Sequence, residues 1–113
     1  MAFKEVTLKG DQVKYRLSPE IKLFTLSDLN FIKTRNGNFE LKQSLDPMEP
    51  YLKKAIKLKI MISSDLKSFR MSVVDGSELK AVDIFSNDKF NAEKEQFLFY
   101  MDNFIERKIF IAD

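Results

Sequence analysis

The sequence predicts an α+β fold in which antiparallel β-hairpins and a meander form two sheets packed against one C-terminal helix. Apolar and polar residues alternate through much of the first 85 residues, as they do in strands with one buried face. Short turns that contain glycine separate these stretches, and such turns join antiparallel strands. After Asn91 the apolar spacing changes to the 3.6-residue period of a helix. We therefore expect residues 1–113 to form a single α+β domain.

A first hairpin is predicted around Gly10-Asp11, because apolar and polar residues alternate on both sides of this pair. A two-residue turn that begins with glycine is typical of type II′. The implied register places Leu8 opposite Val13 and Val6 opposite Tyr15. All four side chains then share the buried face of the sheet.

The segment after this hairpin is ambiguous. Ser18 and Pro19 are residues that can begin a short turn of helix. Thr25 and Asp28 have the spacing of a capping box, which is a weak signal by itself. The conformation of residues 18–30 is left open.

A second hairpin is predicted at Asn36-Gly37, the strongest local turn signal in the chain. This pair is preferred in type I′ turns, in which both central residues have positive φ. The implied register pairs Thr34 with Phe39, Lys33 with Glu40 and Ile32 with Leu41.

A three-stranded meander is predicted between residues 56 and 84. Its first strand directs a set of apolar residues to the buried face: Ile56, Leu58, Ile60 and Ile62. A two-residue turn at Gly76-Ser77 would join the second and third strands. That turn pairs Met71 with Val82, Phe69 with Ile84 and Arg70 with Asp83, and it places Lys80 opposite Val73.

Residues 92–107 are predicted to form the one long helix, with Asn91 as its N-cap. A buried stripe recurs at helical spacing: Phe97, Met101, Phe104 and Ile105. Phe99 and Tyr100 widen the apolar surface beyond this stripe, and we expect the N-terminal sheet, rather than a partner, to cover them. Residues 109–111 form either a last turn or a short closing strand.

The chain has no cysteine and no histidine. This excludes thiol nucleophiles, Ser-His pairs, disulfides and metal sites built from thiolate or imidazole ligands. We expect no catalytic residue, no metal site and no cofactor, and the sequence favours a non-enzymatic protein over an enzyme of unfamiliar type. Asp46 and Glu49 are the one magnesium alternative, but loop carboxylates usually face water. Asp83 with Arg70 is interpreted as a structural cross-strand pair.

The charge is unevenly distributed along the chain. Residues 1–59 hold twelve Lys/Arg and seven Asp/Glu, whereas residues 60–113 hold seven and ten. A basic stripe on the outer sheet face and the flank of the helix supply the candidate binding residues: Lys53, Lys57, Lys59, Arg70 and Tyr100. Because the aromatic residues of the strands face inward, nucleic acid is a less favoured partner than a protein or a small metabolite. A monomer and a homodimer both remain open.

The N-terminal residues MAFKEVTLKG lack the charged and apolar regions of a signal peptide. No apolar run approaches the ~20 residues that a membrane span needs. We expect a soluble cytoplasmic protein with no membrane partner.

Several segments resemble the domain-of-unknown-function family 1831 of lactic-acid bacteria across the whole chain. They are LSPEIKLFTLSD, GNFELKQSLDP, SFRMSVVDGSEL with the following VDIF, and EQFLFYMDNFIERKIF. The resemblance implies an α+β fold with two sheets packed against one helix. It also implies a role in amino-acid metabolism, with genes for sulfur and methylthio metabolism nearby.

The resemblance further implies a remote similarity of fold to S-adenosylmethionine decarboxylases. Those enzymes cleave themselves at a Glu-Ser bond to form a pyruvoyl group, assisted by His and Cys. This chain has no Glu-Ser dipeptide, no His and no Cys, so the decarboxylase activity does not carry over. The leading hypothesis is a small non-enzymatic binding or accessory protein in amino-acid or sulfur metabolism. The alternative is an RNA-contacting accessory in tRNA sulfur modification.

Overall fold

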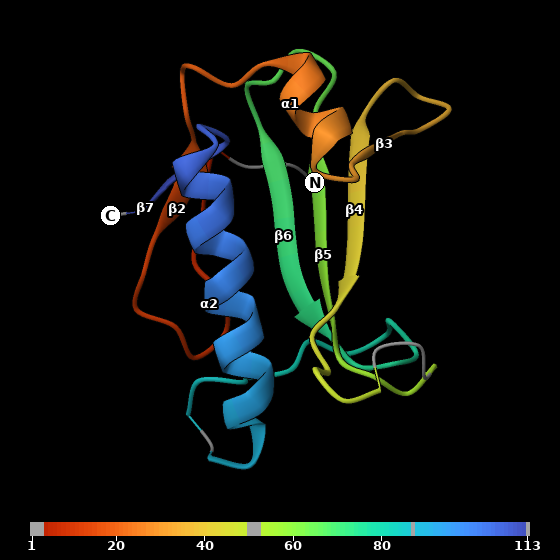
Figure 1. The fold of residues 1–113 in the computed structure, drawn as a ribbon, viewed down its shortest axis with the longest axis vertical. Helices are drawn as coiled ribbons and strands as arrows, with labels where there is room; N and C mark the ends of the chain where they lie inside the picture. The colour runs from red at the N-terminus through yellow and green to blue at the C-terminus, as the bar shows by residue number, and fades with distance from the viewer. Residues whose placement is uncertain (1–3, 50–52, 87, 113) are drawn as a thin grey trace.

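Two antiparallel sheets and one long helix surround a common apolar core (Figure 1). The computed structural model describes residues 4–49, 53–86 and 88–112. The smaller sheet has the order β1-β2-β7, with β1 at Glu5–Val6, β2 at Tyr15–Leu17 and β7 at Phe110–Ala112. The larger sheet has the order β3-β4-β5-β6, with β3 at Ile32–Lys33, β4 at Phe39–Ser44, β5 at Lys57–Ile62 and β6 at Phe69–Val74. Helix α1 spans Leu23–Asp28, and a 3₁₀ turn at Asp88–Phe90 leads into helix α2 at Asn91–Glu106. The predicted α+β class, with two sheets and one main C-terminal helix, is confirmed.

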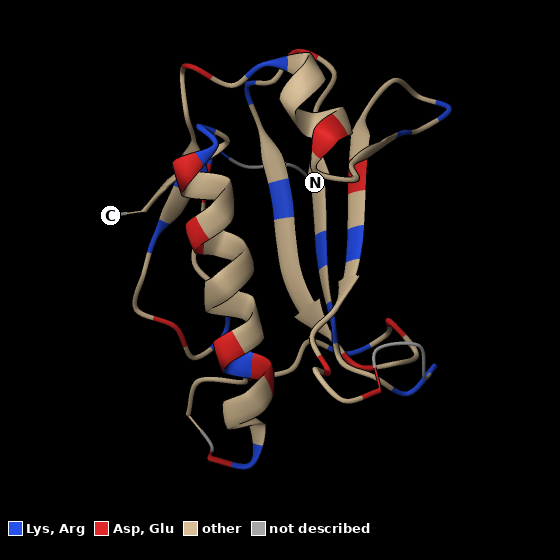
Figure 2. Ribbon diagram, in the orientation of Figure 1, with Lys and Arg blue, Asp and Glu red and all other residues tan. Residues whose placement is uncertain are grey.

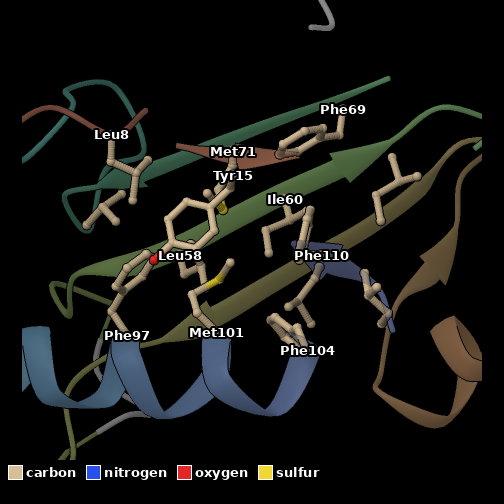
Figure 3. Close-up of a cluster of buried hydrophobic side chains, with 14 of the residues drawn as sticks. Leu8, Tyr15, Leu58, Ile60, Phe69, Met71, Phe97, Met101, Phe104 and Phe110 are labelled. Carbon is tan, nitrogen blue, oxygen red and sulfur yellow. The ribbon is translucent and has the colours of Figure 1, made fainter. Parts of the chain in front are cut away.

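The core lies between α2 and the inner faces of the two sheets. Phe97, Met101 and Phe104 of α2 are at most 2% exposed. Figure 3 shows these side chains directed toward Leu58 and Ile60 of β5. Because each buried phenylalanine stabilises the fold by about 2–3 kcal/mol, this stripe is a main source of stability.

The smaller sheet is held to the same core by aromatic contacts. The ring of Tyr15 in β2 meets the ring of Phe97 edge-on, with centroids 6.1 Å apart. The ring of Phe110 in β7 lies 5.1 Å from that of Phe69 in β6 and 6.2 Å from that of Phe104 in α2. Phe110 therefore links both sheets and the helix.

The first hairpin has the predicted register but a different turn. Val6 pairs with Tyr15, as expected, and Leu8 and Val13 also pack into the core. The backbone N–H of Asp11 donates to the carbonyl of Leu8 at 3.0 Å, so Gly10 is the third residue of the turn, with a φ of 83°. That position and φ match type II, and the predicted type II′ turn is wrong.

Residues 18–30 form a turn and the short helix α1. The Ser18 hydroxyl accepts a hydrogen bond from the Glu20 N–H at 3.1 Å, but the helix begins only at Leu23. Thr25 and Asp28 both lie inside α1, so they do not form a capping box.

The Asn36-Gly37 turn has three loop residues instead of two, and the predicted type I′ turn is wrong. Gly37 has a φ of 86°, whereas Asn36 does not take a positive φ. The N–H of Gly37 donates to the carbonyl of Thr34 at 3.0 Å, and the N–H of Thr34 donates to the carbonyl of Asn38 at 2.7 Å. This is the pattern of a type I turn followed by a left-handed glycine.

The extra loop residue shifts the hairpin register by one position. Ile32 pairs with Glu40, not with Leu41, and its side chain is 72% exposed. A shift of one residue moves a side chain to the opposite face of a sheet. Phe31 takes the buried position instead, 5% exposed, with its ring 5.8 Å from that of Phe104. Burial of the larger aromatic side chain explains why this register is preferred.

The predicted meander keeps two of its three strands. β5 and β6 pair as a regular ladder, and Leu58, Ile60 and Ile62 are buried. The third segment forms only an isolated bridge between Val74 and Ala81.

The loop after β6 is longer than predicted, which shifts every pair beyond it. The N–H of Asp75 donates to the carbonyl of Lys80 at 3.0 Å, and the N–H of Val82 donates to the carbonyl of Val73 at 2.8 Å. Lys80 therefore lies opposite Asp75, and Val82 lies opposite Val73. The predicted pairing of Arg70 with Asp83 is wrong, since the Asp83 carboxylate instead accepts hydrogen bonds from the N–H groups of Phe85 and Ser86 at 2.9 and 3.0 Å.

Helix α2 agrees with the prediction within one residue at each end. Phe90, rather than Asn91, occupies the N-cap position. At its C-terminus the N–H of Ile109 donates to the carbonyl of Phe104 at 2.9 Å and the N–H of Lys108 to that of Ile105 at 3.1 Å, with Lys108 at a φ of 66°. This Schellman motif reverses the chain, and the following residues form β7, the closing strand of the two alternatives.

No helix among the described residues has the length and apolar character to cross a bilayer.

Gly37→Val should destabilise the protein by more than about 1 kcal/mol, because a β-branched residue is forced into the left-handed region. The space beside Gly37 is open enough for a Cβ, with the nearest atom 3.7 Å away, so the cost is one of conformation. Gly37→Asn is the matched control and should cost less than Gly37→Val, since asparagine tolerates this region. Urea denaturation midpoints measure both, and equal midpoints for wild type and Gly37→Val would contradict the assigned turn.

Candidate binding site on the outer face of the large sheet

The outer face of the larger sheet carries most of its charged residues, because strand alternation sends the apolar residues to the core. Antiparallel pairing arranges the outer face of β4, β5 and β6 in three cross-strand rows. They are Ser44–Lys57–Val74, Lys42–Lys59–Ser72 and Glu40–Met61–Arg70. Figure 2 shows the basic positions of β4, β5 and β6 on neighbouring strands.

The three lysines of these rows lie around one carboxylate, that of Glu78. Glu78 Oε1 lies 3.3 Å from Lys42 Nζ and 3.2 Å from Lys59 Nζ, and Glu78 Oε2 lies 4.0 Å from Lys57 Nζ. We call Lys42, Lys57 and Lys59 the lysine cluster. With three ammonium groups and one carboxylate, this group keeps an excess of positive charge.

The loop after β6 positions Glu78 over the cluster. The N–H of Glu78 donates to the carbonyl of Asp75 at 2.9 Å, and Glu78 has a φ of 64°. Gly76 lies directly against the backbone of Lys53 and Lys54, where any side chain would clash. Hydrogen bonds from Lys59 and Lys42 lower the pKa of the Glu78 carboxyl.

A hollow of about 170 Å³ lies beside the lysine cluster on the same face. We call it the outer-face hollow; it is lined by Glu40, Lys59, Ile60, Met61, Arg70 and Ser72. Glu40 and Arg70 occupy the two ends of one cross-strand row, with Met61 between them. Among the described residues neither Glu40 nor Arg70 has an ion-pair partner.

The predicted binding residues fall into two separate places. Lys57, Lys59 and Arg70 share the outer face, and the backbone of Lys53 packs against the loop that carries Glu78. Tyr100 belongs to α2, which packs on the inner face of the same sheet. The helix flank and the basic face therefore do not form one continuous surface.

Tyr100 packs against the core and is partly buried, whereas its neighbour Phe99 is 65% exposed. Their rings meet with centroids 5.7 Å apart. The expectation that the N-terminal sheet covers both residues is wrong for Phe99, whereas Tyr100 is partly buried against the core.

The carboxylates of Asp46 and Glu49 are not arranged as a cation site. The Asp46 carboxylate accepts hydrogen bonds from the N–H groups of Met48 and Glu49, at 2.9 and 3.0 Å, and these bonds lower its pKa. Within residues 4–49, 53–86 and 88–112, no group of three His, Cys, Asp or Glu side chains could hold a metal ion.

Sequence reasoning did not name Glu40, Lys42, Met61, Ser72 and Glu78 as candidate binding residues. The alternation in NFELK already directs Glu40 and Lys42 away from the core, so both could have been found. Glu78 could not, because its place depends on the length of the loop that carries it.

Tyr100→Asp should destabilise the protein by about 1–3 kcal/mol, because it places a carboxylate against the core. Phe99→Asp is the matched control and should change the stability by less than about 0.5 kcal/mol, as is usual for an exposed position. Thermal unfolding of the two variants tests this, and a larger loss for Phe99→Asp would contradict the packing of α2.

The Glu78 ion pairs should make part of the stability depend on pH. A carboxyl whose pKa is lowered on folding stabilises the fold above its ordinary value of 4.5, and this contribution is lost as the pH falls through the lowered value. Glu78→Gln should therefore flatten the loss of stability below pH 4.5 relative to wild type. Urea midpoints between pH 3 and pH 7, roughly the range in which carboxyls titrate, measure the difference. Parallel wild-type and Glu78→Gln curves would contradict it.

Comparison with known protein families finds one family model that matches this chain. Residues 1–111 match the family model DUF1831, described as "Putative amino acid metabolism". The fold is similar to the crystal structure of a DUF1831 family protein from Lactobacillus plantarum, with a TM-score of 0.91 and 41% sequence identity over 99% of this chain and 97% of that one. No curated protein matches the chain. With its fold and almost all of its sequence matched, this chain belongs to the DUF1831 family.

Proposed function

We propose that this DUF1831 protein is a non-enzymatic binding protein that holds a small amino acid in the outer-face hollow. One observation supports this above all: the side chains of Glu40 and Arg70, which have no ion-pair partner among the described residues, lie in one row with the apolar side chain of Met61 between them. One strand, β5, lies between the ends of this row, so Glu40 and Arg70 are two strand spacings apart, which is roughly 10 Å at the backbone. Long side chains can close on a small ligand across that distance.

The groups of the hollow complement those of an amino acid. The Arg70 guanidinium suits a carboxylate, which it can bind through two parallel hydrogen bonds. The Glu40 carboxylate suits an ammonium group, and the Ser72 hydroxyl can donate or accept one further hydrogen bond. Met61 offers an adaptable apolar surface for a side chain. The volume of about 170 Å³ is below the ~300 Å³ at which pockets for drug-sized ligands begin, so it favours a small molecule.

The family description supports the same class of ligand, since it places the family in amino acid metabolism. The RNA alternative has less support. The three outer-face rows contain no aromatic side chain on which a base could stack, and Glu78 already occupies the lysine cluster.

Binding is tested by titrating amino acids into the isotope-labelled protein and following backbone NMR signals of β4, β5 and β6. We expect saturable shifts centred on the Glu40–Met61–Arg70 row. Arg70→Gln and Glu40→Gln should each weaken binding at least about tenfold, because each removes a charged hydrogen-bonding partner. Lys94→Gln on α2 is the matched control and should bind like wild type.

The absence of saturable shifts with every amino acid would overturn the proposal. Equal affinity in wild type and Arg70→Gln would also overturn it, because the ligand would then not use the hollow.

A further inference from the structure

We infer that the lysine cluster is an oxyanion site filled by the protein's own Glu78, and that the preferred amino acid carries a second anionic group that replaces this carboxylate. The inference rests on the proposed function and names its ligand class: acidic or phosphorylated amino acids. The observation behind it is a carboxylate held by ammonium groups from two strands, beside a hollow suited to an amino acid.

The geometry of the cluster already suits an oxyanion. Lys42 and Lys59 approach one oxygen of Glu78, at 3.3 and 3.2 Å, and Lys57 approaches the other at 4.0 Å. The side chains of Lys57 and Glu78 are only 22% and 28% exposed, so the contact is partly shielded from water. Partial shielding strengthens the attraction of the ammonium groups for any anion placed there.

The charge of the cluster favours a ligand with more negative charge than Glu78 supplies. Three lysines against one carboxylate leave two positive charges unbalanced. A phosphate group with two negative charges would relieve more of the repulsion among the lysines than a carboxylate does. A displacing group therefore gains from the same field that holds Glu78.

The Glu78 side chain can leave without opening its loop. The loop is closed by backbone hydrogen bonds of Asp75 to Glu78 and Lys80, at 2.9 and 3.0 Å. The Asp75 carboxylate further accepts hydrogen bonds from the N–H and hydroxyl of Ser77, at 3.1 and 2.6 Å. None of these contacts uses the Glu78 carboxylate, so its release costs the ion pairs and not the loop.

The cluster and the hollow are close enough for one small ligand. Lys59 belongs to both, since it lines the hollow and contacts Glu78. The rows Lys42–Lys59–Ser72 and Glu40–Met61–Arg70 are two residues apart along each strand, which is roughly 7 Å. A ligand with its α-carboxylate at Arg70 and a second anionic group at the cluster spans this distance.

The experiment compares matched ligand pairs by calorimetry: glutamate with glutamine, and O-phosphoserine with serine. In wild type O-phosphoserine should bind more tightly than serine, whereas glutamate should gain less over glutamine, because its carboxylate only replaces that of Glu78. In Glu78→Gln the preference for the anionic member of each pair should grow at least about tenfold, because the competing carboxylate is gone, whereas glutamine and serine should bind as in wild type. Adding Lys42→Gln to Glu78→Gln should remove the gain, since Lys42 contacts Glu78 but does not line the hollow. Glu95→Gln is the control for a lost exposed carboxylate.

The outcomes separate this inference from the proposed function. If glutamine binds in an Arg70-dependent way but Glu78→Gln gains nothing for glutamate or O-phosphoserine, the inference is overturned and the proposed function stands. If no amino acid binds but inorganic phosphate binds Glu78→Gln in a Lys42-dependent way, the proposed function is overturned, and with it the amino-acid ligand class. A gain for O-phosphoserine without one for glutamate supports the inference and identifies phosphate as the second group.

Discussion

The architecture depends on the burial of the apolar stripe of α2 between the two sheets. Phe97 and Phe104 reach the smaller sheet through Tyr15 and Phe110, and Phe110 also meets Phe69 of the larger sheet. The smaller sheet could not enclose α2 by itself, since β1, β2 and β7 are only two or three residues long. The helix is therefore the element on which both sheets pack, and the smaller sheet gains its stability from the helix.

Chain reversals after both helices complete this core in the same way. Asn30 and Lys108 take left-handed φ values of 72° and 66° and close Schellman motifs. The residues that follow, Phe31 and Ile109, are 5% and 0% exposed. An apolar residue at this position commonly packs against the last turn of its helix. Each helix end thus sends an aliphatic or aromatic side chain into the core, and the second reversal leads directly into β7.

The concentration of apolar side chains on the inner face leaves the outer face of the larger sheet to charged residues. There the charged side chains form two neighbouring groups that differ in whether their charges are paired. The lysine cluster is occupied by Glu78, whereas Arg70 and Glu40 have no ion-pair partner among the described residues. A continuous ladder of three strands, β4, β5 and β6, holds both groups in register.

The sequence by itself determined the α+β class, the position of α2 and most of the buried face. These follow from the spacing of apolar residues along the chain, which is the same for a strand or a helix whatever its surroundings. It also placed Lys57, Lys59 and Arg70 on one outward face, because alternation within a strand does not depend on its neighbours. Only the tertiary structure decided the registers across the two turns. One extra loop residue exposed Ile32 and buried Phe31, and two extra residues after β6 separated Arg70 from Asp83 and positioned Glu78 over the lysines. The physical reason is that the free energies of alternative turns differ by little, so that burial of Phe31 and the hydrogen bonds of Asp75, which form only in the folded chain, select among them.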